Sequence, residues 1–451
     1  MNGATSSPAA QSLSAAVPSS PTTSTTSSTD TNSGGVPAQV SPSWLSDIQP
    51  IAGNVQSYPT GPVPTGPFTA AVGPLTGYPQ AWKAPDPTSA EVVAVINSLD
   101  WTQVPNSAVR QAGSGGGVKM TGYSASDPDC WWSASGCTVS KRSNIPADVA
   151  FCPTAGDWGL TYDDGPLTAD AGQWAEPNLY DSLAANNQKA GLFYIGSNVV
   201  NAPAAAQRAL ADGHTICVHT WSHPAMTSQT NQQIVAQFYW TLRAIKEVTG
   251  VTPRCWRPPY GDVDDRVRAI AWQMGMTTVL WDQDTNDWNM PGSGGGNLPP
   301  ATVDGYFEKW INARKSGTDN QRGHIVLQHE LNDATVSMAE KWLPQVQEAF
   351  RLVPWNECVQ MAYPYWEENF VYPPGNPTAS SSSDSAAGIS SVSPSTTQDA
   401  TLSVGSSGAG SGAESTTSNS KTSGAHTSVT ANKCVTVIWL SLISGLFILY
   451  I

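Results

Sequence analysis

The 451-residue sequence has 12% charged residues, a formal net charge of −14 and a pI near 4.7. A nucleic-acid partner would require a basic face, so this balance excludes that class of function. Both ends of the chain are rich in Ser, Thr, Ala and Gly, and they contain too few apolar side chains to offset the entropy of ordering them.

The composition divides the chain into five segments. We expect a disordered Ser/Thr-rich segment over 1–40, an extension of unknown role over 41–145, a main domain over 146–370, a Ser/Thr-rich stalk over 371–425 and a C-terminal signal segment, removed on maturation, over 426–451. The chain contains 18 tryptophans. Trp-rich surfaces with little charge suit stacking on sugar rings, although burial in the core is the simpler interpretation of any single one.

Short apolar runs alternate with helical patterns along the main domain. The patterns predict helices over 89–99, 203–211 and 231–248, a loop over 196–202, and strands over 158–162, 190–195, 214–218, 254–256, 277–281 and 324–328. Strands alternating with helices indicate a parallel sheet or barrel of the α/β class.

The predicted strands share one feature, because each ends in polar residues. These strand-end residues are Asp163, Asp164, His219, Arg257, Asp284 and His329. A (β/α) barrel assembles its active site at the carboxyl ends of its strands. A core packed for stability alone would not require this pattern, so it predicts an active site.

His219 and His223 are four residues apart, which on a helical turn directs both rings to the same side. A polar helix face would explain such a pair standing alone. Here Asp163 and Asp164 end a neighbouring strand, and two imidazoles with a carboxylate describe a catalytic zinc site. Thr220 occupies the place where a zincin protease has its Glu, so a protease is not indicated.

Five segments of the sequence resemble, in order, the five motifs of carbohydrate esterase family 4. This family contains the NodB-like polysaccharide deacetylases, including fungal chitin deacetylases. The segments are Thr161–Pro166 (TYDDGP), His219–His223 (HTWSH), Arg257–Tyr260 (RPPY), Asp284–Trp288 (DTNDW) and Leu327–His329 (LQH). The resemblance covers about residues 150–360 and implies a distorted (β/α) barrel of the NodB-homology type.

The resemblance also implies a divalent metal, commonly Zn2+, with Co2+ or another divalent ion as alternatives. The implied ligands are Asp164, His219 and His223, and Asp163 is implied as the general base. An amide also needs its amine leaving group protonated, and the implied general acid is His329.

Other positions are implied to support these groups. Arg257 would orient Asp163, and Asp284 would pair with His329, although the acid at Asp287 leaves open which of the two is the partner. The remaining implied residues are the backbone N–H of Tyr260 for the oxyanion, and Trp288 and Leu327 as the wall around the acetyl methyl. Glu330 stands where the family usually has Asp.

We therefore expect a chitin deacetylase that hydrolyses N-acetyl groups of N-acetylglucosamine units, giving chitosan and acetate. The alternatives are the same fold acting on peptidoglycan or acetyl-xylan, and a non-catalytic carbohydrate-binding wall protein. A broken metal triad or a lost base would favour the last alternative, but all these positions are filled. The expected protein is a monomer.

Six of the seven cysteines lie in the folded part of the chain, and Cys434 opens the apolar tail. An even number in an exported chain indicates up to three disulfides, for which the sequence allows 15 connectivities. The resemblance suggests a bond between Cys152 and Cys358. Proximity in the sequence suggests Cys130 with Cys137, and Cys217 with Cys255.

The C-terminal tail, Cys434–Ile451, is uncharged and apolar and follows a polar spacer and the small residues Ser423–Ala425. This order is typical of a glycosylphosphatidylinositol (GPI) attachment signal that is removed on maturation, with Ser423 as the attachment residue. A tail-anchored transmembrane helix is the alternative. The first residues are not a signal peptide, so we expect a leader missing from this sequence, and O-linked sugars on the Ser/Thr-rich ends.

Overall fold

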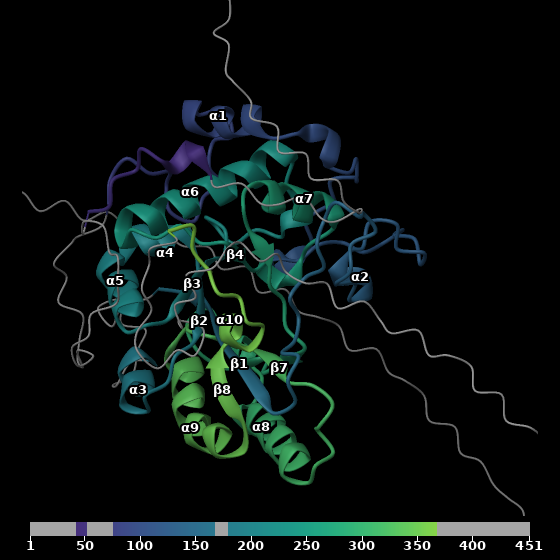
Figure 1. The fold of residues 1–451 in the computed structure, drawn as a ribbon. Coiled ribbons are helices and arrows are strands. Elements are labelled where there is room, and N and C mark those ends of the chain that lie inside the picture. The colour runs from purple at the N-terminus through teal and green to yellow at the C-terminus, as the bar shows by residue number, and fades with distance from the viewer. Residues whose placement is uncertain (1–41, 52–74, 167–178, 368–451) are drawn as a thin grey trace, which may run out of the picture. The chain divides into compact units, whose positions relative to one another are not determined.

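The computed structural model describes residues 42–51, 75–166 and 179–367 (Figure 1). The two Ser/Thr-rich segments, the apolar tail and Ser423 lie outside the described residues. Within the described ranges, no helix combines the length and the apolar character needed to cross a membrane.

The strands of the described residues form one parallel sheet at the centre of the fold (Figure 1). They are β1 Asp157–Gly165, β2 Gly191–Tyr194, β3 Thr215–Val218, β4 Cys255–Trp256, β5 Thr277–Thr278, β6 Gln283–Asp284, β7 His324–His329 and β8 Arg351–Pro354. Their order is β5-β4-β3-β2-β1-β7-β6, and β8 also pairs with β1. The carboxyl ends of the strands therefore share one edge, as a (β/α) barrel requires.

The barrel is distorted because its two marginal strands do not pair, although only 279–282 separate them in the chain. This connection crosses from one margin of the sheet to the other. On the way, the N–H of Leu280 donates to the carbonyl of Val149, and the N–H of Asp282 donates to the carbonyl of Ile325 on β7. The expected α/β fold class is confirmed, in the form of a curled parallel sheet that hydrogen bonds do not close.

Helices surround this sheet (Figure 1). They are α1 Ala90–Ser98, α2 Trp132–Ser135, α3 Leu179–Ala185, α4 Gly196–Asn201, α5 Pro203–Ala211, α6 Asn231–Thr249, α7 Asp265–Gln273, α8 Pro300–Lys315, α9 Asp333–Ala349 and α10 Trp355–Cys358. Short 3-10 turns are η1 Ser43–Leu45, η2 Trp101–Gln103, η3 Ser114–Gly116, η5 Met226–Ser228, η6 Pro259–Gly261 and η7 Asp287–Asn289. The expected loop over 196–202 was wrong, because residues 196–201 form α4.

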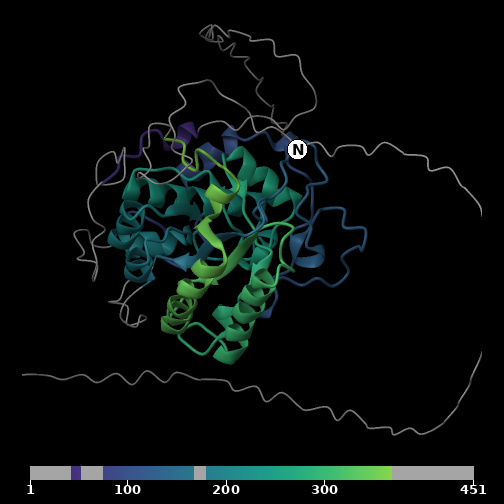
Figure 2. The same ribbon diagram turned by 60° about the horizontal axis from the view of Figure 1, so that its bottom comes forward.

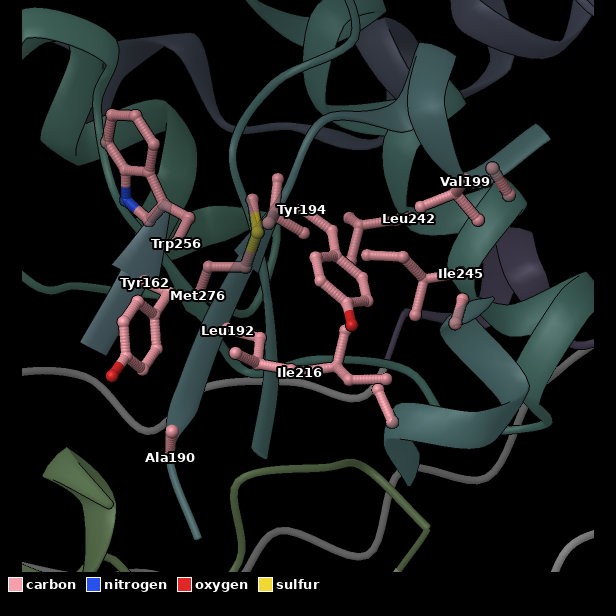
Figure 3. Close-up of a cluster of buried hydrophobic side chains, with 14 of the residues drawn as sticks. Tyr162, Ala190, Leu192, Tyr194, Val199, Ile216, Leu242, Ile245, Trp256 and Met276 are labelled. Carbon is pink, nitrogen blue, oxygen red and sulfur yellow. The ribbon is translucent and has the colours of Figure 1, made fainter. Parts of the chain in front are cut away.

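Helix α6 shows how local sequence sets an element. Thr230 and Gln233 form a capping box at its start, and Gly250 ends it with a φ of 82°, which glycine adopts without a steric penalty. Its apolar face packs on the sheet, where Leu242 and Ile245 lie next to Tyr194 of β2 (Figure 3). Each such buried aliphatic side chain stabilises the fold by about 1.5–3 kcal/mol.

Helices α8 and α9, green in both views, pack side by side against the part of the sheet that contains β1 and β7 (Figure 1, Figure 2). The rings of Phe307 and Trp342 stack between them with centroids 5.4 Å apart. Trp158 of β1 contacts Phe307 from the sheet, with centroids 6.2 Å apart. These aromatics fix the helices that flank β7, which carries His329.

Three disulfides join the same pairs that the sequence analysis expected. They link Cys130 to Cys137, Cys152 to Cys358, and Cys217 to Cys255. The last bond connects β3 to β4, the two strands that precede His219 and Arg257. The second encloses 206 residues and ties the chain before β1 to α10.

Candidate active site

The carboxyl end of β1 presents two acids in succession. A register irregularity between Asp163 and Gly165, together with a φ of 78° at Asp164, breaks the regular alternation of side chains. Both carboxylates consequently approach the same imidazole: Asp163 Oδ2 lies 3.7 Å and Asp164 Oδ1 lies 3.5 Å from Nε2 of His219. Adjacent acids are thus directed into one site.

The loop after β3 brings the two histidines together. His223 Nε2 lies 3.3 Å from Asp164 Oδ1, and the His219 and His223 ring centroids are 5.0 Å apart. The expected helical turn was wrong, because residues 219–223 are not helical and Thr220 and His223 have φ values of 67° and 58°. Two left-handed residues, rather than a helical repeat, turn the rings to the same side.

Each histidine has its second ring nitrogen engaged. His219 Nδ1 lies 2.8 Å from the carbonyl oxygen of Arg257, which only accepts, so Nδ1 carries the proton and Nε2 presents a lone pair. His223 Nδ1 lies 3.2 Å from the hydroxyl of Tyr260. Burial lowers the pKa of His223 to about 4, so its imidazole is neutral at neutral pH.

Asp164, His219 and His223 form a donor set that fits a divalent cation. One ligand atom from each lies within 4.8 Å of the others. Asp164 Oδ1 is buried and makes no hydrogen bond to the described residues, an arrangement that is costly unless a cation or other partner satisfies it. One carboxylate and two imidazoles leave coordination positions open for water and substrate.

Arg257 fixes one oxygen of Asp163. Its side chain is fully buried, and Nη1 donates to Asp163 Oδ1 at 2.7 Å and to the hydroxyl of Thr161 at 2.9 Å. Nη2 donates to the carbonyl of Leu280 at 3.2 Å. Asp163 therefore turns a defined second oxygen, Oδ2, toward the histidines, where it is positioned to take a proton.

His329 ends β7 directly beside β1, in register with Asp163. Its Nδ1 lies 2.6 Å from Asp287 Oδ1, and its backbone N–H donates to Asp287 Oδ2 at 2.9 Å. Burial by itself would lower the pKa of His329, but Asp287, with Asp164 and Asp163 nearby, raises it to about 10. The protonated ring has Nε2 left to donate a proton.

The implied pair of Asp284 with His329 was wrong, and Asp287 takes that place. Asp284 Oδ1 instead accepts the N–H of Asn286 at 2.7 Å. Asn286 has a φ of 53°, which reverses the chain direction after β6 and brings Asp287 back over His329. The sequence analysis had left this alternative open, and only the family resemblance favoured Asp284.

The other expected residues are Tyr260 and Trp288, which are exposed, and Leu327, which is not. The Tyr260 ring packs edge-on against His223, with centroids 4.8 Å apart, and Tyr260 has a φ of 59°. The Trp288 side chain is exposed, and the backbone N–H of Trp288 donates to Asp287 Oδ1 at 2.9 Å. Leu327 is buried two residues before His329 on β7.

Two further contacts were not visible in the sequence. Asn198, at the start of α4, donates from Nδ2 to the carbonyl of Asp164 at 2.7 Å. Gly116, from the N-terminal extension, lies so close to Tyr260 that a Cβ there would stand 2.0 Å from the Tyr260 hydroxyl oxygen. Neither position carries a local motif, because both depend on packing between distant parts of the chain.

The chain is similar to a set of named proteins. A family model described as polysaccharide deacetylase matches residues 152–279. A chitin deacetylase of Amylomyces rouxii is 46% identical over 62% of this chain and 64% of its own length. Chitin deacetylase 2 of Cryptococcus neoformans var. grubii is 38% identical over 72% of this chain and 69% of its own length. The solved chitin deacetylase of Colletotrichum lindemuthianum is 26% identical, with a TM-score of 0.43 over 50% of this chain and 97% of that one.

Proposed function

Because the chain belongs to the polysaccharide deacetylase family, we propose that it hydrolyses N-acetyl groups of N-acetylglucosamine units in chitin, giving chitosan and acetate. The observation that carries this proposal is one cluster at the strand ends: the donor set Asp164, His219 and His223 lies beside Asp163 and next to the strand that ends in His329. The choice of chitin is supported by the names of the curated relatives, which the chain matches over about two thirds of their length.

The chain's own residues have defined tasks in this reaction. Asp164 Oδ1, His219 Nε2 and His223 Nε2 would hold Zn2+, or Co2+ in its place. The bound cation supplies a Lewis acid that polarises the amide carbonyl and acidifies water. These three side chains also set where the acetamide group lies relative to the acid and the base.

Asp163 and His329 move the protons. Asp163 Oδ2 takes a proton from the attacking water as the oxygen adds to the amide carbon, while Arg257 holds Oδ1. The backbone N–H of Tyr260 is the proposed donor to the oxyanion. His329 Nε2 then gives its proton to the amide nitrogen as the C–N bond breaks, which releases acetate and a free amine.

Acetate release from chitin oligomers tests this proposal. We expect release by the wild type, loss after chelation and return on adding Zn2+. Asp163→Asn should lower kcat by about two to four orders of magnitude. Glu308→Gln, on the exposed face of α8, is the control and should leave the rate unchanged.

The same assay separates the alternatives. Release from peptidoglycan or acetyl-xylan but not from chitin would replace the substrate and keep the chemistry. If the zinc-loaded wild type releases no acetate from any of the three polymers, the enzyme proposal fails and a carbohydrate-binding wall protein takes its place.

For location, we propose a monomeric protein secreted to the fungal cell wall and held at the plasma membrane by a GPI anchor at Ser423. The three disulfides support an oxidising compartment. A phosphatidylinositol-specific phospholipase C should release the protein from membranes. Retention after this treatment, or an unchanged location of the Ser423→Leu variant, would contradict the anchor assignment.

A further inference from the structure

Trp82, in the N-terminal extension, has one of two highly exposed indoles in the described part of the chain. Its exposed fraction is 50%, and that of Trp288, the residue after Asp287, is 44%. The remaining described tryptophans are buried or half-buried. Leaving an indole in water forfeits a large apolar burial, so an indole that the fold keeps exposed points to a ligand.

The backbone holds Trp82 in an unfavourable conformation. Its φ is 62°, a left-handed value that is rare for a bulky residue. Its N–H donates to the hydroxyl of Ser197 at 2.8 Å, and two residues earlier the carbonyl of Gln80 accepts the indole N–H of Trp221 at 3.3 Å. Such strain persists where surrounding contacts fix it, and it concentrates at binding and catalytic sites. Asp164 and His223 have left-handed backbones of the same kind.

The residue that binds the backbone of Trp82, Ser197, also binds a loop that carries metal ligands. The Ser197 hydroxyl that accepts from Trp82 donates to the carbonyl of Trp221, which lies between His219 and His223 in the chain. The next residue, Asn198, donates to the carbonyl of Asp164. One short helical turn at the start of α4 therefore connects Trp82 to both loops that carry the ligands.

We propose that Trp82 forms a sugar-stacking position, on which the apolar face of a pyranose ring packs at a distance from the unit being deacetylated that a dimer does not span. The inference rests on the proposed function, since it requires a polymer of N-acetylglucosamine as the ligand. Pyranose C–H faces match an exposed indole, and an uncharged sugar chain is not repelled by an acidic protein. Trp82 would thus extend the site along the polymer, and it supplies a task for a segment in which the sequence shows no motif.

The test compares kcat and KM across chitin oligomers from the dimer to the hexamer. In Trp82→Ala, KM for the hexamer should rise about three- to tenfold, the range of one aromatic stacking contact, while kcat and the dimer KM stay unchanged. Trp82→Phe should recover part of the hexamer affinity. Tyr363→Ala is the matched control, because Tyr363 is 53% exposed and its carbonyl accepts from Arg254, at the amino end of β4 and away from the site.

Calorimetric binding of the hexamer supplies a readout that does not depend on turnover. It is measured in the Asp163→Asn background with and without Trp82→Ala, and the double variant should bind about three- to tenfold more weakly. Unchanged binding and KM, with a wild type that releases acetate, would overturn the stacking position alone. An equal loss for dimer and hexamer with a lower Tm would make Trp82 structural and overturn it too. A wild type that neither releases acetate nor binds the hexamer would refute the proposed function and this inference together.

Discussion

Asp287 holds His329 through both of its carboxylate oxygens, one against Nδ1 at 2.6 Å and the other against the backbone nitrogen at 2.9 Å. These two contacts fix the His329 ring beside Asp163 of the adjacent strand. They also favour the imidazolium form, which raises the pKa of His329 to about 10 although burial opposes this. The stabilisation is fully present below the ordinary histidine pKa near 6.5 and is lost as pH rises through about 10.

Asp287→Asn should therefore move the alkaline limb of the kcat/KM profile to lower pH. Removing the carboxylate removes the main charge that raises the pKa of His329, so the ring loses its proton earlier. Asp284→Asn is the matched control, because Asp284 bonds to the N–H of Asn286 and not to His329. A limb that moves in Asp284→Asn and not in Asp287→Asn would reverse the assignment.

Asn198→Ala should weaken metal binding by about ten- to a hundredfold, the usual effect of removing a group that orients a ligand. Asn198 holds the carbonyl of Asp164, so its loss frees the backbone that aims the carboxylate. Competition with a chelating dye measures the Zn2+ affinity. Asn186→Ala, which removes a bond to the carbonyl of Ser182 on α3, should leave this affinity unchanged. Equal affinities in all three proteins would show that Asn198 does not orient the ligand.

Gly116→Ala should lower kcat/KM about tenfold or more, in the manner of a small misplacement within a catalytic site. The new methyl group would meet the Tyr260 hydroxyl and push the ring off His223. Gly122→Ala separates this clash from backbone strain: Gly116 and Gly122 have φ values of 89° and 81°, but Gly122 has no neighbour within 4 Å of a Cβ. We expect both variants to lose stability and only Gly116→Ala to lose activity. Similar activity in the two variants would show that the contact between Gly116 and Tyr260 does not affect catalysis.

The disulfides should differ in their contributions to stability. In the chain-entropy model, replacing Cys152 and Cys358 by Ala costs about 5 kcal/mol, because that bond closes a loop of 206 residues. Replacing Cys130 and Cys137, only seven residues apart, costs about 2 kcal/mol. Urea unfolding measures both free energies. A larger loss for the short loop would mean that native packing, rather than chain entropy, sets the order.

The sequence predicted best where a local pattern decides the structure. The helix expected over 203–211 has those bounds as α5, and the helix expected over 231–248 is α6, one residue longer. Both have regular apolar spacing, and α6 has its own capping box. The expected ends of β3 and β4 also agree, since a buried apolar run must stop where polar side chains begin. However, β1 continues to Gly165 instead of ending at 162, and β5 ends at Thr278 instead of 281.

The sequence predicted poorly where contacts between distant parts of the chain, or a single backbone angle, determine the local conformation. Residues 196–201 have no helical pattern, and α4 forms where the N–H groups of Gly196 and Ser197 donate to carbonyls of the loop after β3. The helical turn expected at His219–His223 overlooked Pro224, which disfavours a helical conformation in the residue before it. The partner of His329 depended on a single left-handed residue, Asn286, whose conformation no periodicity reveals.

Strand β1 is the first strand of the sheet to be synthesised and among the last to be completed. It pairs with β2 on one side, but its other partners are β7 and β8, up to 194 residues downstream, as the pairing of Asp157 with Arg351 shows. A nascent chain must therefore keep one edge of its central strand unpaired while the residues between β1 and β7 are synthesised, which exposes that edge to aggregation. Termination of translation before β7 would consequently yield an aggregation-prone, incompletely folded chain and not a less active enzyme.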